Sequence, residues 1–174
     1  LLAGGKKYSL SSRRHPGVYY PDGPRFQTAF VPFPCPSFTY EAGGFRVIRE
    51  LMLLQGRNVL LIRYTLARTA RKGPSSASLQ VAPLLAFRSF HSLTHKNDAL
   101  CGSISPACSG FSIHPYKELP PLTFQSDGNF TFVSSPLWIE RVEYTEEERR
   151  GFDFNEDLFL PGSFTLSLQN GESA

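Results

Sequence analysis

The chain has 174 residues, which suits one domain with a sizeable core, and its 41% hydrophobic and 19% charged content is that of a globular protein. The net charge is only +3 and the basic residues are scattered, so we expect no nucleic-acid partner. No run approaches the ~20 apolar residues that a membrane-spanning helix needs, so we expect no membrane partner.

The composition favours strands and rigid turns, because the chain holds 15 Phe, 7 Tyr and 14 Pro. The three cysteines cannot all pair with one another, and their spacing fits no zinc ligand set. We therefore expect a reducing, cytoplasmic compartment, no metal and no cofactor.

Alternation of apolar and polar residues predicts half-buried strands throughout the chain. In Leu60–Leu66 the even positions are apolar, and in Leu79–Phe87 most of the odd positions are. Phe164, Leu166 and Leu168 alternate with Ser and Thr in the last predicted strand. Turn sequences separate the earlier strands, at Glu41–Gly44 and at Gln55–Asn58.

Ser126-Asp127-Gly128-Asn129 separates Leu122–Gln125 from Phe130–Val133, and Asp-Gly between alternating runs predicts a hairpin. We find no internal repeat and no linker. The sequence therefore predicts an all-β chain, an antiparallel β-sandwich formed by residues 1–174 as a single domain.

One helical signal interrupts the strands, near residues 145–150. Thr145 and Glu148 have the spacing of a capping box, in which Thr145 is the N-cap and Glu148 reaches back to its backbone N–H. Gly151 then supplies a left-handed residue that ends the helix. We predict a helix of one to two turns.

Six of the 15 acidic residues lie between Glu146 and Asp157. Asp153, Glu156 and Asp157 are candidates for catalytic carboxylates or sugar-binding acceptors, and the alternative is that such residues build turns through local hydrogen bonds. The spacing of Asp153, Asn155 and Asp157 also copies the start of a calcium loop. The required Gly and final Glu are absent, so we reject calcium.

Arg88 and His91 directly follow a predicted strand, where a polar pair could bind a sugar or a partner domain, or could tie down the acidic stretch and cap a turn. We predict that Arg88 or Arg150 forms a buried or half-buried ion pair with Asp153, Glu156 or Asp157. Trp138, Tyr144 and most of the Phe are expected in the core.

The C-terminal quarter of the sequence carries a long and specific pattern. Its fixed positions are Trp138, Glu143, Tyr144, Glu147, Arg150, Gly151, Asp153, Glu156, Asp157, Leu158, Pro161, Gly162 and Phe164. This pattern resembles the end of the N-terminal domain of bacterial and archaeal glycogen debranching enzymes of the amylo-α-1,6-glucosidase type. Upstream pieces follow in the family's order, among them Tyr20–Gly23, Pro36–Tyr40, Asn58–Tyr64 and Pro83–His91.

The resemblance implies a β-supersandwich followed by an (α/α)6 barrel, which carries the acid and base that hydrolyse α-1,6-linked branches of glycogen and limit dextrin. We expect no catalytic residue in this chain. The family partners would be the α-glucan and the C-terminal catalytic barrel domain. The candidate substrate-binding or domain-interface residues are Arg88, His91, Glu147, Arg150, Asp153, Glu156 and Asp157.

One departure from the family concerns the N-terminus, since members usually begin with a further stretch that has no counterpart here. We therefore expect a chain truncated within the domain. Two alternatives stay open. One is a stand-alone carbohydrate-binding β-sandwich, and the other is a mutarotase-like epimerase in which His91, His114 and Glu118 converge.

Overall fold

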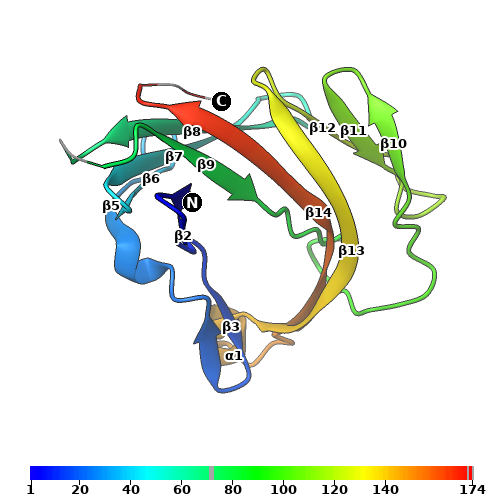
Figure 1. Cartoon of the computed structure of the whole chain (residues 1–174). Coiled ribbons are helices and arrows are strands. Elements are labelled where there is room, and N and C mark those ends of the chain that lie inside the picture. The colour runs from blue at the N-terminus through cyan, green and yellow to red at the C-terminus, as the bar shows by residue number, and fades with distance from the viewer. Residues whose placement is uncertain (71–72, 172, 174) are drawn as a thin grey trace. The chain divides into compact units, whose positions relative to one another are not determined.

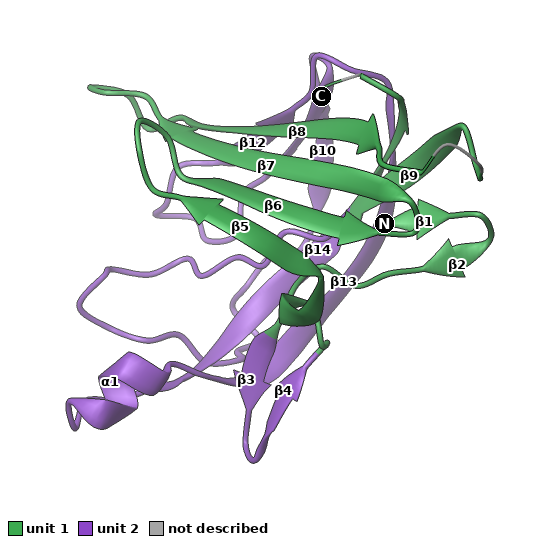
Figure 2. Cartoon of the chain, turned by 90° about the vertical axis from the view of Figure 1, so that its left-hand side faces the viewer, with its two compact units in different colours: residues 1–12, 21–80, 165–174 green, residues 13–20, 81–164 purple. Residues whose placement is uncertain are grey.

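The computed structural model describes residues 1–70, 73–171 and 173. Over these residues the chain consists of antiparallel strands, one 3-10 turn and one short α-helix (Figure 1). The prediction of an all-β antiparallel chain with one short helix is confirmed. The chain divides into two compact units, one of residues 1–12, 21–80 and 165–174 and the other of residues 13–20 and 81–164 (Figure 2).

The elements of the first unit are β1 (Leu2–Ala3), β2 (Lys6–Lys7), the 3-10 turn η1 (Pro24–Phe26), β5 (Gln27–Val31), β6 (Ser37–Ala42), β7 (Phe45–Leu53), β8 (Leu60–Arg68) and β9 (Ser76–Val81, without its last residue). Those of the second unit are β3 (Arg13–His15), β4 (Val18–Tyr20), β10 (Ile104–Ala107), β11 (Gly110–Ile113), β12 (Leu122–Gln125), β13 (Phe130–Glu143) and the helix α1 (Thr145–Arg149). The strand β14 (Asn155–Gln169) belongs to both, with residues 155–164 in the second unit and 165–169 in the first.

The first unit contains a four-stranded antiparallel sheet in the order β5-β6-β7-β8 (Figure 2). The predicted turns at Glu41–Gly44 and Gln55–Asn58 join β6 to β7 and β7 to β8, as expected. Phe45, Val47 and Leu66 are the most deeply buried side chains of this sheet, because alternate residues of each strand face the core.

The alternation in β8 does not bury all of its apolar residues, which corrects the expectation for Leu60–Leu66. Leu60 and Ile62 are 56% and 43% exposed. The reason lies in the register, since β6 begins at Ser37 opposite Glu50. Beyond that point β7 and β8 continue as a two-stranded hairpin, which has no third strand beside it.

The first unit also holds β2, β1 and β9 in that order, with β14 next to β9. Leu166 and Leu168 of β14 are buried, which confirms the alternation predicted for the last strand. The strand predicted for Leu79–Phe87 is wrong beyond Val81, where β9 ends. Pro83 has no N–H to donate to a sheet, so only Leu85 makes a single bridge, to Phe159.

In the second unit, two sheets pack face to face. One is β10-β11-β12, and the other contains β14, β13, β3 and β4 in that order. Five phenylalanines join them, with ring centroids 4.0–5.6 Å apart. They are Phe111, Phe124, Phe130, Phe132 and Phe164. This packing is that of a β-sandwich.

The predicted hairpin of Leu122–Gln125 and Phe130–Val133 is wrong. The turn at 126–129 exists, with the Gly128 N–H donating to Ser126 Oγ at 3.1 Å. However, β12 pairs with β11 and β13 pairs with β14 and β3, so the turn carries the chain from one sheet to the other. Phe124 and Phe130 both contact Phe164, which favours this crossing over a hairpin.

The helix α1 begins one residue earlier than the capping box predicts, because Tyr144 is the N-cap and makes no side-chain cap. The Glu148 carboxylate instead pairs with Arg14 Nη1 at 2.5 Å, and Arg14 Nε lies 2.9 Å from Glu143 Oε2. An ion pair to β3 thus replaces the local cap. Gly151 has a φ of 76° and ends the helix as predicted.

Gly162 marks a close approach of β14 to β13. Its φ is 151°, and a Cβ built on it would lie 2.2 Å from the Val133 carbonyl oxygen. We predict that Gly162→Ala lowers the free energy of unfolding by at least about 3 kcal/mol, the upper end for a glycine-only backbone conformation, because the carbonyl must also move. Chemical denaturation of the 174-residue chain measures the change.

Gly17→Ala is the matched control. Gly17 also has a positive φ, 76°, in the β3–β4 turn, but nothing lies within 4 Å of its added Cβ. We expect a cost of about 1–2 kcal/mol from the left-handed backbone alone. Equal effects of the two substitutions would contradict the role given to the β13–β14 contact.

Candidate functional site

Glu156 is the only charged side chain that is buried among the described residues, with no exposed surface. It is the second residue of β14 and lies within the acidic stretch that the sequence singles out. A buried carboxylate is costly unless hydrogen bonds and an opposite charge compensate the loss of water. Its partners therefore decide what this site can do.

Both carboxylate oxygens of Glu156 are occupied. Oε1 accepts from Arg88 Nε and from the Thr94 backbone N–H, which is 3.0 Å away. Oε2 accepts from the Tyr144 hydroxyl and from Arg88 Nη2 at 3.2 Å. We call these four residues, Arg88, Thr94, Tyr144 and Glu156, the Glu156 cluster. The predicted half-buried ion pair of Arg88 is thereby confirmed.

Backbone hydrogen bonds bring the members of the cluster to β14. Leu85 and Phe159 exchange two N–H···O bonds of 2.9 Å, which places the following Arg88 beside the strand. The Asp157 N–H donates to the Thr94 carbonyl, and the Tyr144 N–H donates to the Phe154 carbonyl, both at 2.9 Å. The segment 82–99 forms no strand, so these bonds and the cluster hold it against β14.

The cluster sets the protonation of its acidic groups. Burial raises the pKa of Glu156, but the hydrogen bonds from Arg88, Tyr144 and Thr94, with the charge of Arg88, outweigh burial, and the pKa lies below the ordinary value. Burial and donation to the Glu156 carboxylate raise the pKa of Tyr144 to about 12. At neutral pH the cluster therefore holds a carboxylate, a guanidinium and a neutral phenol.

Asp157 fixes a second pair of backbone groups. Its carboxylate accepts from the Lys96 N–H at 2.9 Å and from the Arg141 N–H at 2.8 Å, with His95 Nδ1 at 3.8 Å. Arg141 has a φ of 59°, an uncommon conformation that the bond from its N–H stabilises. Burial raises the pKa of Asp157, but the two backbone donors outweigh it and the pKa is lowered.

Of the predicted site residues, Arg88 and Glu156 meet in the Glu156 cluster, and Asp157, next to Glu156, binds the Lys96 and Arg141 N–H groups. The structure does not bring the others into the cluster. His91 is exposed, and the centroid of its ring lies 3.7 Å from that of Phe90. Glu147 Oε1 lies 3.7 Å from Arg150 Nη1, at the surface near the end of α1. For the mutarotase alternative, His114 Nε2 is already engaged with the Leu119 carbonyl at 2.6 Å.

Sequence reasoning missed Tyr144 and Thr94 as members of the cluster. Tyr144 was expected in the core, and its hydroxyl is the part that matters. The one available signal was its place among the fixed positions of the C-terminal pattern. Thr94 contributes only its backbone N–H, which no side-chain pattern reveals.

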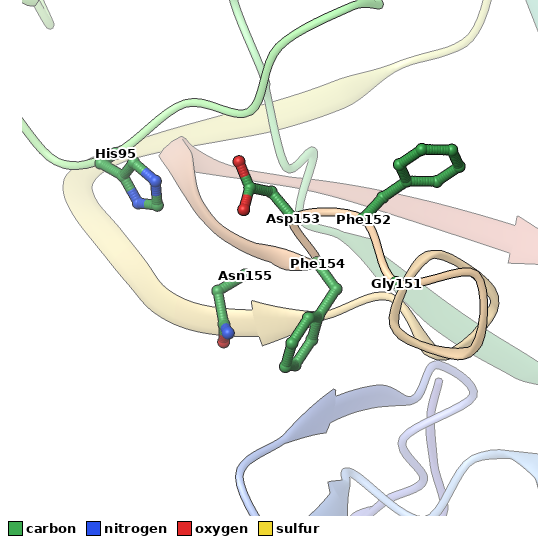
Figure 3. A pocket seen from close by; sticks show the side chains of 6 residues that line it. All are labelled: His95, Gly151, Phe152, Asp153, Phe154 and Asn155. Carbon is green, nitrogen blue, oxygen red and sulfur yellow. The ribbon is translucent and has the colours of Figure 1, made fainter.

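Asp153 lines a separate pocket of about 280 Å³, together with His95, Gly151, Phe152, Phe154 and Asn155 (Figure 3). Asp153 lies between His95 on one side and Phe152 on the other, with its carboxylate pointing away from the ribbon (Figure 3). Among the described residues, no group of three or more His, Cys, Asp and Glu side chains could hold a metal ion.

The chain matches the family described as "Glycogen debranching enzyme N terminal" over residues 1–174. The chain belongs to this family. The searches of curated proteins and of solved structures found no match. In this glycogen debranching enzyme N-terminal domain, three positions of the C-terminal pattern, Tyr144, Glu156 and Gly162, lie in close contacts within the fold. No helix among the described residues is long and apolar enough to cross a membrane.

We predict that Glu156→Gln lowers the free energy of unfolding by about 3 kcal/mol at pH 7. This is the low end for breaking a buried ion pair, because the Arg88 side chain is 22% exposed. Glu140→Gln is the control, since Glu140 forms only an exposed ion pair, with its Oε1 2.7 Å from Lys96 Nζ, and solvent screening should make its effect on stability much smaller. Urea denaturation compares the two variants.

The difference in the free energy of unfolding between the wild type and Glu156→Gln should depend on pH. A carboxyl whose pKa is lowered by folding adds stability above its unfolded value, about 4.3, and loses it as the pH falls through the folded value. This difference in the free energy of unfolding should therefore be largest near neutral pH and should decrease below pH ~4. A difference that increases as the pH is lowered would contradict the conclusion that Glu156 is ionised.

Proposed function

We propose that this chain is the non-catalytic N-terminal domain of a cytoplasmic glycogen debranching enzyme. The full-length enzyme would hydrolyse the α-1,6-glucosidic branch points of glycogen and limit dextrin. The family match over residues 1–174 carries the proposal. The free thiols of Cys35, Cys101 and Cys108 are consistent with a reducing compartment.

The chemistry of the acidic stretch supports a non-catalytic role. Glycosidases need a carboxylic acid that protonates the leaving oxygen and a second carboxylate about 5–10 Å away. Glu156 and Asp157 do not fit the first role, because their lowered pKa values keep them ionised and their oxygens already accept hydrogen bonds. Of the three carboxylates proposed from sequence, only Asp153 is exposed. The reacting acid and base would then belong to a catalytic barrel domain.

The remaining candidate residues suit a surface that contacts that domain. His91, Glu147 and Arg150 have exposed or half-exposed side chains. Phe90, beside His91, is 83% exposed, so its ring would be accessible to a partner domain. In this proposal the Glu156 cluster holds the loop that presents Phe90 and His91, so the buried ion pair serves the interface indirectly.

We predict that the isolated 174-residue chain releases no glucose from limit dextrin. The expected rate equals that of a buffer blank, because neither Glu156 nor Asp157 is available as the proton-donating acid. An active debranching glucosidase under the same conditions is the positive control, and a glucose-specific coupled assay gives the readout. Glucose release that survives purification and is abolished by Asp153→Ala would overturn the proposal.

A further inference from the structure

The polar side chains at the start of β14 divide into two groups. The Glu156 carboxylate accepts four hydrogen bonds, and the Asp157 carboxylate accepts two from backbone N–H groups, so both serve contacts within the fold. Asp153 and Asn155 differ, because neither side chain makes a hydrogen bond or ion pair within the described part of the chain. Both line the pocket (Figure 3).

The lining of the pocket indicates the kind of ligand it would take. It combines one carboxylate, one amide and one imidazole with two aromatic rings, and Phe152 is 63% exposed. A metal ion would require several oxygen ligands, and an anion would be repelled by Asp153. Planar donors and acceptors beside an aromatic ring suit a neutral ring that has hydroxyl groups at its rim and C–H groups on its face.

We propose that Phe152, Asp153, Asn155 and His95 form a binding subsite for a single glucosyl unit of an α-glucan. The choice of glucose rests on the proposed function, and the choice of a neutral polyhydroxyl ring rests on the pocket alone. The volume of about 280 Å³ is close to the lower end for ligand pockets, about 300 Å³, which suits one sugar ring rather than a long chain.

Each lining residue has a distinct part in this subsite. The Asp153 carboxylate accepts hydrogen bonds from two neighbouring hydroxyl groups, and the Asn155 amide both donates and accepts. Phe152 offers its ring to the C–H face of the sugar. His95 closes the opposite side of Asp153 (Figure 3).

Glu156 and Asp157 fix the position of the loop that carries His95. Asp157 binds the Lys96 N–H next to His95, and Glu156 binds the Thr94 N–H before it. The loop that bears His95 is therefore fixed to the same strand that bears Asn155. A prearranged site loses little conformational entropy on binding, which favours recognition of a weakly interacting neutral sugar.

The test is a titration of the 174-residue chain with maltoheptaose, followed by two-dimensional ¹H–¹⁵N NMR. We expect saturable shift changes concentrated at residue 95 and residues 151–155. Asp153→Ala and Phe152→Ala should each raise the Kd about tenfold, the effect of losing hydrogen bonds to a charged group or an equivalent contact. Both side chains are exposed, so the variants should fold, and their spectra verify this directly.

Asp127→Ala and Phe33→Ala are matched controls, since each removes an exposed side chain of the same type outside the pocket. Both should leave the Kd unchanged. Absence of saturable binding, or binding that the two pocket variants leave unaltered, would overturn the subsite. That result would not affect the proposed function, which fails only if the chain itself releases glucose.

Discussion

The second unit depends on one buried negative charge. The Glu156 carboxylate is removed from water, and it is tolerated because Arg88, Tyr144 and the Thr94 N–H occupy both of its oxygens. These partners come from two segments of the chain, and Glu156 itself lies in a third. A single carboxylate therefore ties the end of β13, the segment after β9 and the start of β14 to one another. Removing this carboxylate would leave the Arg88 guanidinium without its counter-charge, and the segment 82–99 would lose the hydrogen bond from the Thr94 N–H to Glu156.

This constraint helps to explain why the acidic stretch of residues 146–157 has so few carboxylates available for chemistry. Glu148 pairs with Arg14, Glu156 is enclosed by its cluster, and Asp157 holds two backbone N–H groups. Three of the six acidic residues between Glu146 and Asp157 are thus committed to contacts within the fold. Asp153 is left at a pocket, which favours ligand contact over catalysis as its role.

The all-β architecture was predictable from strand alternation. An ion pair between Arg88 or Arg150 and the acidic stretch was also predictable, but the structure was needed to show that Arg88 and Glu156 form it. The failures came where tertiary packing overrode a local signal. Ser126–Asn129 has the sequence of a hairpin turn, yet its two strands lie in different sheets, which a cluster of five phenylalanines joins. Thr145 has the spacing of a cap, yet Arg14, 134 residues from Glu148, takes its carboxylate. Distant partners of this kind leave no periodic trace in the sequence.

The ionisation of Glu156 within the folded chain is the most direct test of this account. Carbon-13 NMR of the side-chain carboxyl, recorded as a function of pH in the folded range, reports it without any substitution. The account predicts a midpoint below the ordinary glutamate value of about 4.3. A midpoint well above that value would mean that burial dominates over the cluster, and would make Glu156 a proton donor rather than a structural anion.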